Sequence, residues 1–234
     1  DSDNLRSYLV EFEEHGGIFG HLGIRNFVEG DFFGWYLDGW DEPTDASLRE
    51  VIRELSGYSF VTLDIDPEGT RDLLKKLYQY LLPRKIRHDL GEYYTPDWLA
   101  ERVLNQVGYD GELTKRLLDP SCGSGTFLTL AIRRAKQFAL DHIAEYPERR
   151  EVGKKILTNI VGFDLNPLAV IAARTNYLLG FADYLKDVRP IEIPVYICDS
   201  ILTPTRYAEK SSLFECEHYK LKTIVGPFDV PAAI

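Results

Sequence analysis

Residues 119 to 127 read DPSCGSGTF, and they connect a short apolar run, Leu117 and Leu118, to a long segment with helical periodicity. That order predicts a strand, a glycine turn and a helix. Gly123 and Gly125 can adopt backbone angles closed to other residues, and without Cβ atoms they let a ligand lie directly against the main chain. The turn also leaves the first amides of the helix free for a polar or negative ligand group. It suits a nucleotide-like cofactor, although tight helix-to-strand packing explains a lone Gly-x-Gly pattern equally well.

Two further predicted strands also end on an aspartate. IVGFD at 160–164 reads as a buried strand, and residues 191–199 alternate apolar side chains before they reach an acid. Asp164 follows Asp119 by 45 residues and Asp199 follows Asp164 by 35, which leaves room for a helical crossover each time. A parallel, right-handed βαβαβ unit is the economical topology. One such aspartate could be a helix cap, but three at the carboxyl edge of one sheet indicate a shared ligand crevice.

The predicted fold class is α/β, a Rossmann-like sheet preceded by a small helical region. Pro194 lies inside the third strand, and because proline lacks a ladder donor this strand should be the rim, which gives the order 3-2-1. We expect a mainly helical N-terminal region over residues 1–82 and a cofactor-binding domain over residues 83–234. From residue 203 onward the sequence predicts no clear element until 223–225. Amphipathic helices are predicted in the N-terminal region at 4–13, 44–55 and 70–81.

Helix boundaries follow from capping residues. Thr44 or Asp45 is expected to cap the second N-terminal helix. Thr95 is predicted to cap a helix with proline at its first position, and Gly108 to end it. After the second strand, Asn166 should cap an apolar and therefore buried helix that Gly180 closes.

Composition narrows the class of protein. Hydrophobic residues make up 44% and charged residues 27%, as in soluble globular proteins. No apolar run approaches membrane length, and no leader opens the chain, so no membrane association is predicted. Three cysteines are too few for a disulfide or zinc framework, which indicates a reduced, cytoplasmic protein. The five histidines are scattered and none has a partner at metal or triad spacing, so no metal site is predicted.

The net charge of −10 is unevenly distributed. Residues 1–70 carry 4 basic and 16 acidic side chains, whereas residues 71–234 carry 23 basic and 21 acidic ones. A surface that binds duplex DNA normally has a basic footprint, which this chain as a whole lacks. If the protein acts on nucleic acid, most phosphate contacts are expected outside this piece.

Four motifs in order carry a family resemblance: GEYYTP at 91–96, DPSCGSGTF at 119–127, GFDLNP at 162–167 and CDS at 198–200. Together they resemble the adenine-N6 DNA methyltransferases of restriction-modification systems, in the branch of type I modification subunits and fused type II enzymes. The resemblance implies a Rossmann-like fold that binds S-adenosylmethionine and, for the parent protein, a site-specific adenine methyltransferase. A nicotinamide enzyme is disfavoured, because the third glycine of its fingerprint is missing and the acid lies too far along the chain.

The resemblance also assigns cofactor-binding residues. Asp119 would face the ammonium of the cofactor, and Asp164 would hold the ribose hydroxyls. Leu165 would pack on the adenine ring, and Asp199 would accept from its exocyclic amine. The methionine end of the cofactor would lie against Tyr93, Tyr94, Thr95, Cys122, Gly123, Ser124, Gly125, Thr126 and Phe127.

One family motif is absent. The catalytic Asn/Asp-Pro-Pro-aromatic loop should follow the third strand, yet Asn166 and Pro167 are followed by Leu168 and belong to the ribose motif. No catalytic residue is therefore predicted, and this piece alone should bind cofactor without methylating. DNA would be contacted mainly through regions missing from the chain, and a specificity or restriction subunit is a candidate partner.

Two alternatives stay open from the sequence. The same cofactor fold serves RNA and protein-amide methyltransferases. A non-catalytic module is the other alternative, in which the acidic front docks a partner and the pocket is vestigial. The free edge of the first strand is further predicted to promote self-association.

Overall fold

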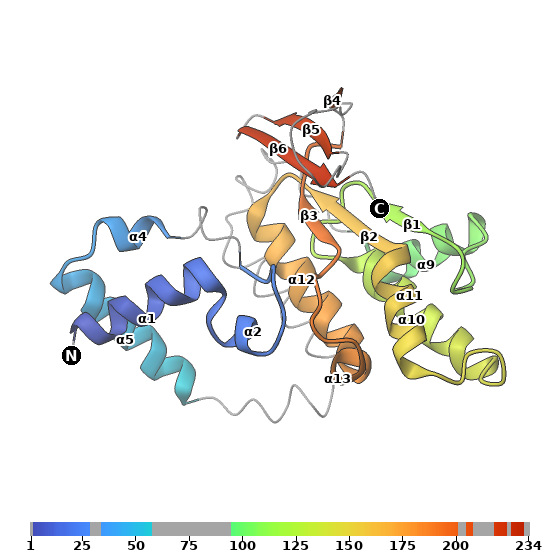
Figure 1. Cartoon of the computed structure of the whole chain (residues 1–234), viewed down its shortest axis with the longest axis horizontal. Helices are drawn as coiled ribbons and strands as arrows, with labels where there is room; N and C mark the ends of the chain where they lie inside the picture. Colours follow the sequence, from blue (N-terminus) through green and yellow to red (C-terminus); the bar gives the residue numbers. More distant parts are fainter. Residues whose placement is uncertain are drawn as a thin grey trace, which may run out of the picture.

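Figure 1 shows the computed structural model of the chain, which describes residues 2–28, 34–57 and 95–200 and three strands beyond them. The N-terminal helices are α1 (Ser2–His15), α2 (Gly17–His21), α4 (Trp35–Asp38) and α5 (Glu42–Ser56). The central elements are α9 (Asp97–Gln106), β1 (Leu117–Asp119), α10 (Thr126–Asp141), α11 (Arg149–Asn159), β2 (Ile160–Asp164), α12 (Pro167–Phe181), η1 (Ala182–Tyr184), α13 (Leu185–Val188) and β3 (Val195–Ile197). The C-terminal strands are β4 (Thr205–Tyr207), β5 (His218–Thr223) and β6 (Gly226–Pro231).

The central sheet is parallel, with the order β1-β2-β3, so the predicted α/β class and the strand order 3-2-1 are confirmed. Leu117 pairs with Ile160, and Gly162 pairs with Val195. Within the described residues, β1 has a strand partner on one side only, and the self-association expected from its free edge stays a prediction.

The third strand is shorter than predicted. Regular pairing starts at Val195, because Pro194 has no N–H to give and contributes only its carbonyl, which accepts from the Gly162 amide at 2.9 Å. Ile191, the predicted start of the strand, instead forms a parallel bridge with Ile24 of the N-terminal region. Asn26 extends this contact, since its side chain donates to the carbonyl of Ile193 at 2.8 Å and accepts from its amide at 2.7 Å.

Helices α9, α10 and α12 pack side by side, and α10 and α12 lie against the strands (Figure 1). The helix predicted from the periodicity after the glycine turn is confirmed as α10, with Ala131 and Ala135 buried and Phe127 and Phe138 packed against the core. Fully buried side chains include Leu128 and Ile132 of α10, Ile156 of α11, Ile160 of β2, Val170, Tyr177 and Phe181 of α12, Ile193 just before β3, and Val195 of β3. This core fixes the strand ends that carry the predicted site.

Three helix boundaries differ from their predictions. Asp41, not Thr44 or Asp45, caps α5, because its carboxylate accepts from the amide of Thr44 at 2.9 Å and leaves Pro43 in the first turn. Pro96, not Thr95, is the N-cap of α9, since its extended backbone delays the helix by one residue.

At α12 the predicted start is confirmed and the predicted end is wrong. Asn166 accepts from the amide of Leu168 at 3.0 Å, and Pro167 opens the helix. Gly180 lies inside the last turn, because the helix continues to Phe181, which is completely buried. The buried character predicted for α12 is confirmed.

The N-terminal helices predicted at 4–13 and 44–55 are confirmed as α1 and α5. The predicted apolar face of α5 does not pack, since Val51, Ile52 and Leu55 are exposed. The helix predicted at 70–81 and the GEYY residues 91–94 lie outside the described residues.

The C-terminal strands were missed by the sequence analysis. They form an antiparallel sheet of order β4-β5-β6, with Leu221 opposite Phe228. Apolar and polar residues do alternate in β5, where Tyr219 and Leu221 lie between polar residues, but no strand of this sheet exceeds six residues and the signal is correspondingly short.

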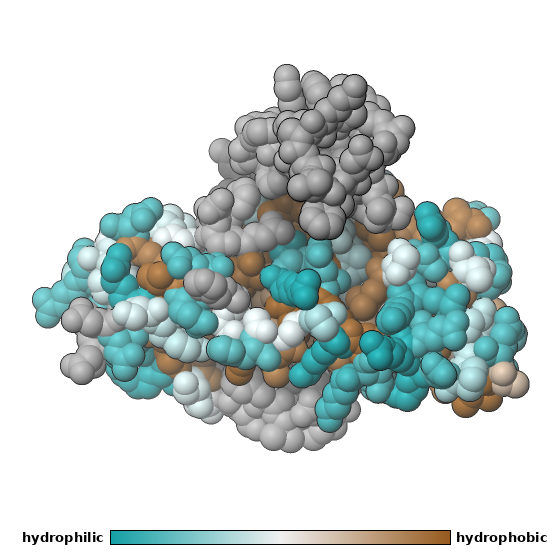
Figure 2. Space-filling model, in the orientation of Figure 1, coloured by the Kyte–Doolittle hydropathy of each residue, from teal (hydrophilic) through white to brown (hydrophobic). Residues whose placement is uncertain are grey.

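On the face seen in Figure 2, hydrophilic residues cover most of the described surface, with apolar residues scattered between them. Among the described residues, no helix combines the length and the apolar character that crossing a membrane requires.

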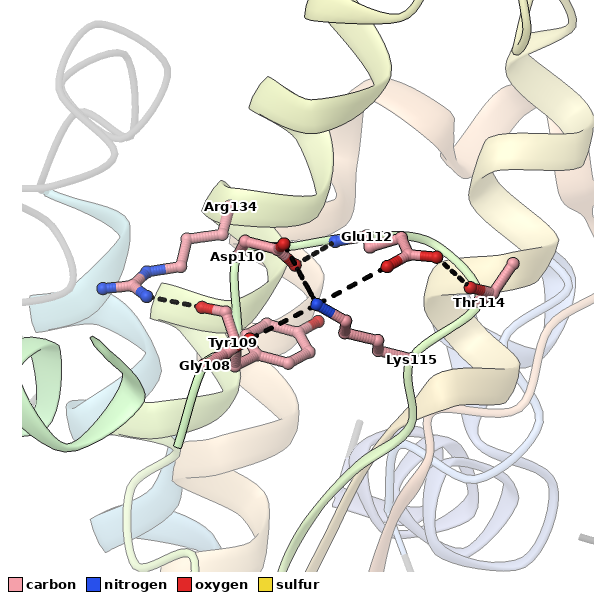
Figure 3. A network of polar contacts seen from close by, with 7 residues as sticks. All are labelled: Gly108, Tyr109, Asp110, Glu112, Thr114, Lys115 and Arg134. Carbon is pink, nitrogen blue, oxygen red and sulfur yellow. Dashed lines mark hydrogen bonds and ion pairs between the residues drawn. The ribbon is translucent and has the colours of Figure 1, made fainter. Parts of the chain in front are cut away.

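The loop between α9 and β1 is held by the polar network in Figure 3. The ammonium of Lys115 lies 3.0 Å from the Asp110 carboxylate and donates to the carbonyl of Gly108, while Arg134 of α10 donates to the carbonyl of Tyr109 at 2.6 Å. Gly108 ends α9 as predicted, with a φ of +68° and the Tyr109 amide bonded back to Leu104. These contacts hold the loop that leads into the amino-terminal end of β1.

Two glycines of this loop give a test of the packing. A Cβ on Gly111, whose φ is +95°, would lie 2.3 Å from the backbone carbon of Arg134, whereas a Cβ on Gly108 would meet nothing within 4 Å. Gly111→Ala should lower the free energy of unfolding by about 3 kcal/mol or more, because strain and overpacking add. Gly108→Ala should cost only the backbone strain, about 1 kcal/mol. Urea denaturation of both variants checks this, and equal losses would contradict the close approach of loop and helix.

Candidate functional site

The carboxyl ends of the three parallel strands place the three predicted aspartates at one edge of the sheet. Asp119 is the last residue of β1, Asp164 is the last residue of β2, and Asp199 follows β3 by two residues. β2 lies between β1 and β3 in the sheet (Figure 1). Asp164, its last residue, therefore lies in the middle of this edge.

The glycine turn after β1 is anchored to β2. The amide of Cys122 donates to the carbonyl of Phe163 at 2.8 Å, and the amide of Gly125 donates to the carbonyl of Cys122 at 2.8 Å. Gly123 and Gly125 both have positive φ values, +53° and +85°. This loop follows strand and precedes helix as the sequence predicts.

The two glycines differ in what surrounds them. A Cβ on Gly125 would lie 3.3 Å from Ala173 of α12, so this glycine serves close packing as well as backbone shape. A Cβ on Gly123 would have nothing within 4 Å. The packing interpretation of the glycine pattern therefore holds at Gly125, whereas Gly123 leaves the main chain open to approach and its contact with a ligand stays a prediction.

Asp164 joins two loops through its carboxylate. One oxygen accepts from the amide of Gly123 at 2.8 Å, and the other accepts from the amide of Asn166 at 2.9 Å. Each carboxylate oxygen has two lone pairs, so the side chain can accept further hydrogen bonds, such as those of a diol.

Asp119 has one carboxylate oxygen without a partner. Its Oδ1 accepts from the amide of Ser121 at 3.2 Å, whereas Oδ2 is buried with no hydrogen-bond donor among the described residues. Burial raises the pKa of Asp119, the Ser121 amide opposes this, and the charge of Asp164 adds to it. A cation placed at Oδ2 would relieve the cost of this buried charge.

The remaining predicted residues lie around this edge. Cys122 and Ser124 are buried in the turn, Thr126 and Phe127 begin α10, and Leu165 is exposed beside Asp164. Burial raises the pKa of the Cys122 thiol well above its ordinary value, so it stays a neutral thiol.

The last three predicted site residues precede α9 in the sequence. Thr95 precedes α9, and nothing in the described contacts brings it to the three aspartates. Tyr93 and Tyr94 lie outside the described residues. In the described part of the chain, no three His, Cys, Asp or Glu side chains gather as metal ligands would.

Comparison with known proteins identifies the family. The family model for N-6 DNA methylases matches residues 69–211, more than half of the sequence. The chain belongs to the N-6 DNA methylase family. The resemblance to adenine-N6 methyltransferases of restriction-modification systems is thereby confirmed.

Several curated relatives share this segment. The methylase subunit of the type I restriction enzyme MjaVII, from Methanocaldococcus jannaschii, is 29% identical over 205 residues, which cover 87% of this chain and 27% of that protein. The EcoEI methylase subunit from Escherichia coli is 29% identical over 153 residues, 64% of this chain and 26% of that protein. This N-6 DNA methylase chain therefore spans about a quarter of the length of these relatives.

A solved structure supports the fold. The chain aligns with the cryo-electron microscopy structure of a DrdV–DNA complex at a TM-score of 0.50 and 16% identity, over 83% of this chain and 19% of that one. At this identity the likeness speaks to the fold, and it agrees with the Rossmann-like sheet.

Two buried polar residues of α12 were missed by the sequence analysis. Arg174 and Asn176 are 1% and 2% exposed, and they donate to the carbonyls of Val195 and Ser124 at 2.9 Å and 2.8 Å. The sequence signal that could have indicated them is the presence of polar residues in an otherwise apolar helix. Their partners could not be read from the sequence, because they lie 21 and 52 residues away.

The raised pKa of Asp119 gives a prediction for stability against pH. Because folding raises this pKa, the folded chain binds more protons than the unfolded chain between the two values, and stability falls as pH rises through that window. Asp119→Asn should therefore stabilise the ligand-free N-6 DNA methylase chain at neutral pH. The gain should vanish below the ordinary aspartate pKa of 3.8. Thermal unfolding at a series of pH values measures it.

Asp164→Asn is the matched control. It leaves one acceptor oxygen for the two amides of Gly123 and Asn166 and turns an NH2 donor towards the other amide, so it should destabilise the chain by about 1.5–3 kcal/mol. A destabilised Asp119→Asn variant at neutral pH would contradict the buried, unpaired carboxylate.

Proposed function

We propose that this chain is the S-adenosylmethionine-binding part of a DNA methyltransferase that transfers a methyl group to adenine N6 in a restriction-modification system. The observation that carries the proposal is Oδ2 of Asp119, a buried carboxylate oxygen with no donor among the described residues, at the edge shared with Asp164. Family membership supports the reaction, because N-6 DNA methylases need a methyl donor.

The donor set fits the parts of this cofactor. Asp119 would bind its ammonium, and the free amides at the start of α10 would face its carboxylate. Asp164 would accept from the ribose hydroxyls with the lone pairs that Gly123 and Asn166 leave free. The bound sulfonium supplies the methyl group.

The other assigned residues complete the proposed site. Leu165, exposed beside Asp164, would pack on the adenine ring, and Asp199 would accept from its exocyclic amine. Tyr93, Tyr94 and Thr95 would border the methionine end together with Cys122, Ser124, Gly125, Thr126 and Phe127. No residue of this chain is proposed to be catalytic.

DNA and a further subunit are the proposed partners. Support comes from the relatives, which are named as methylase subunits of type I restriction enzymes. The acidic residues 1–70 would repel phosphates, so DNA contacts are assigned to other parts of the protein.

Calorimetric titration with S-adenosylmethionine tests the proposed site. The chain should bind, and Asp164→Ala should weaken binding about ten- to a hundred-fold, because charged hydrogen bonds contribute about 1.5–3 kcal/mol. Asp110→Asn is the control, since this exposed aspartate lies before β1 at the opposite end of the strands. No binding by the folded chain would overturn the cofactor assignment, and binding indifferent to Asp164→Ala would place the ligand elsewhere.

A second ligand isolates the role of Asp119. 5′-Methylthioadenosine keeps the ribose and adenine of the cofactor but lacks its ammonium, its carboxylate and its sulfonium charge, so the wild-type chain should prefer S-adenosylmethionine. Asp119→Asn should reduce that preference by the share that the ammonium contributes. If Asp119→Asn leaves the preference unchanged, the assignment of the cofactor's ammonium to Asp119 is wrong.

The methylated substrate needs a different measurement. RNA and protein-amide methyltransferases would use the same cofactor site, and so cofactor binding does not separate them from a DNA enzyme. Transfer of a labelled methyl group to duplex DNA, and not to RNA or protein, by the protein that contains this chain separates the three. Cofactor binding with no transfer to any of them would favour the non-catalytic alternative.

A further inference from the structure

Asn176 connects helix α12 to the glycine turn by a hydrogen bond. The helix approaches so closely that a Cβ on Gly125 would lie 3.3 Å from Ala173. One turn further along, Asn176 is 2% exposed, and its Nδ2 donates to the carbonyl of Ser124 at 2.8 Å. This contact joins residues 52 positions apart in the sequence.

The Ser124–Gly125 peptide is thereby held on both sides. Its carbonyl accepts from Asn176, and the N–H of the same peptide donates to the carbonyl of Cys122 at 2.8 Å. Because a peptide is planar, two bonds on opposite sides fix the orientation of the whole unit. The carbonyl of the following peptide, that of Gly125, accepts from the amide of Thr129 at 2.9 Å and so begins the first turn of α10.

The turn needs such a constraint. Ser124 lies between Gly123 and Gly125, and both glycines have positive φ values. The ψ angle of Ser124 and the φ angle of Gly125 set the orientation of the Ser124–Gly125 peptide, and because glycine populates many backbone conformations this peptide can rotate at low intrinsic cost. A rotated peptide would move the amides of the turn, including that of Gly123, which bonds to Asp164.

The chemistry of Asn176 also argues against a packing role alone. Its Oδ1 is buried and has no hydrogen-bond partner among the described residues. An apolar side chain of the same size would fill this space without burying an unpaired acceptor. What asparagine adds here is the amide donor to Ser124.

We propose that Asn176 is a positioning residue of the methyl-donor site, which acts by holding the Ser124–Gly125 peptide in the orientation that receives the cofactor. This inference rests on the proposed function of the site. Asn176 does not itself touch the ligand. Its effect passes through the turn to Gly123 and Asp164.

The test compares Asn176→Leu with Asn159→Leu. Asn159 makes the same kind of bond, from Nδ2 to the carbonyl of Leu113 at 2.7 Å, but it directly precedes β2 at the other end of the strand. Asn176→Leu should weaken S-adenosylmethionine binding about ten-fold or more, as loss of a residue that orients ligating groups commonly does. It should also speed hydrogen exchange of the Gly125 amide. Asn159→Leu should leave both quantities close to wild type.

Asn176→Asp gives an independent readout and serves if the leucine variant does not fold. An ionised aspartate cannot donate to Ser124, whereas a protonated one can, and its size matches asparagine. Affinity relative to wild type should therefore be low at about pH 8 and recover towards pH 5, where a buried carboxyl is increasingly protonated. Wild type, measured at each pH, accounts for any pH dependence that does not come from the substituted residue.

The outcomes separate the two proposals. In one outcome, the wild-type chain binds S-adenosylmethionine, and the Asn176 variants show unchanged affinity and unchanged hydrogen exchange of the Gly125 amide. This outcome would overturn the positioning role of Asn176 and leave the proposed function standing. A loss of affinity in Asn159→Leu as large as in Asn176→Leu would also overturn it, because the effect would then be general. A folded wild-type chain that does not bind S-adenosylmethionine would overturn both proposals.

Discussion

The carboxylate of Asp164 joins the two irregular loops on which the site depends. It accepts from the amide of Gly123, in the turn after β1, and from the amide of Asn166, at the start of α12. Hydrogen bonds to an ionised acceptor are stronger than neutral ones, so one side chain fixes both loops relative to β2. The glycine turn keeps its open side, and α12 begins where its buried face can pack against α10 and the sheet. A change at Asp164 therefore alters shape as well as chemistry.

The same edge concentrates the negative charge of Asp119 and Asp164. Burial and the charge of Asp164 raise the pKa of Asp119. Its Oδ2 has no hydrogen-bond donor in the described part of the chain. Perturbed carboxylates of this kind occur at functional sites, where stability is lower than packing alone would allow. The well-packed core of α10, α12 and the sheet offsets that cost. A ligand with a cationic group and hydroxyls would pair with Oδ2 of Asp119 and with the remaining lone pairs of Asp164. The electrostatics therefore favour the proposed cofactor over a phosphate.

Local signals made much of this arrangement predictable. Strands that each end near an aspartate, the glycine turn and the cap at Asn166 all depend on neighbouring residues, and the structure contains them. Features that depend on distant partners could not be read from the sequence. The departure of Ile191 from the sheet follows from its pairing with Ile24, and the hydrogen bond of Asn176 goes to a carbonyl 52 residues away. Cap residues failed by one to four positions because proline shifted where the helices begin.

The N-terminal region and the sheet are not independent in this chain. Residues 23–26 run beside the segment that leads into β3, where the amide of Arg25 donates to Ile191 and the amide of Ile191 donates to Gly23. Asn26 adds two bonds to Ile193. These contacts lie just before the strand that leads to Asp199, so displacing the N-terminal helices would remove support from one of the three site aspartates. The edge strand thus obtains its order from residues that precede the whole sheet in the sequence.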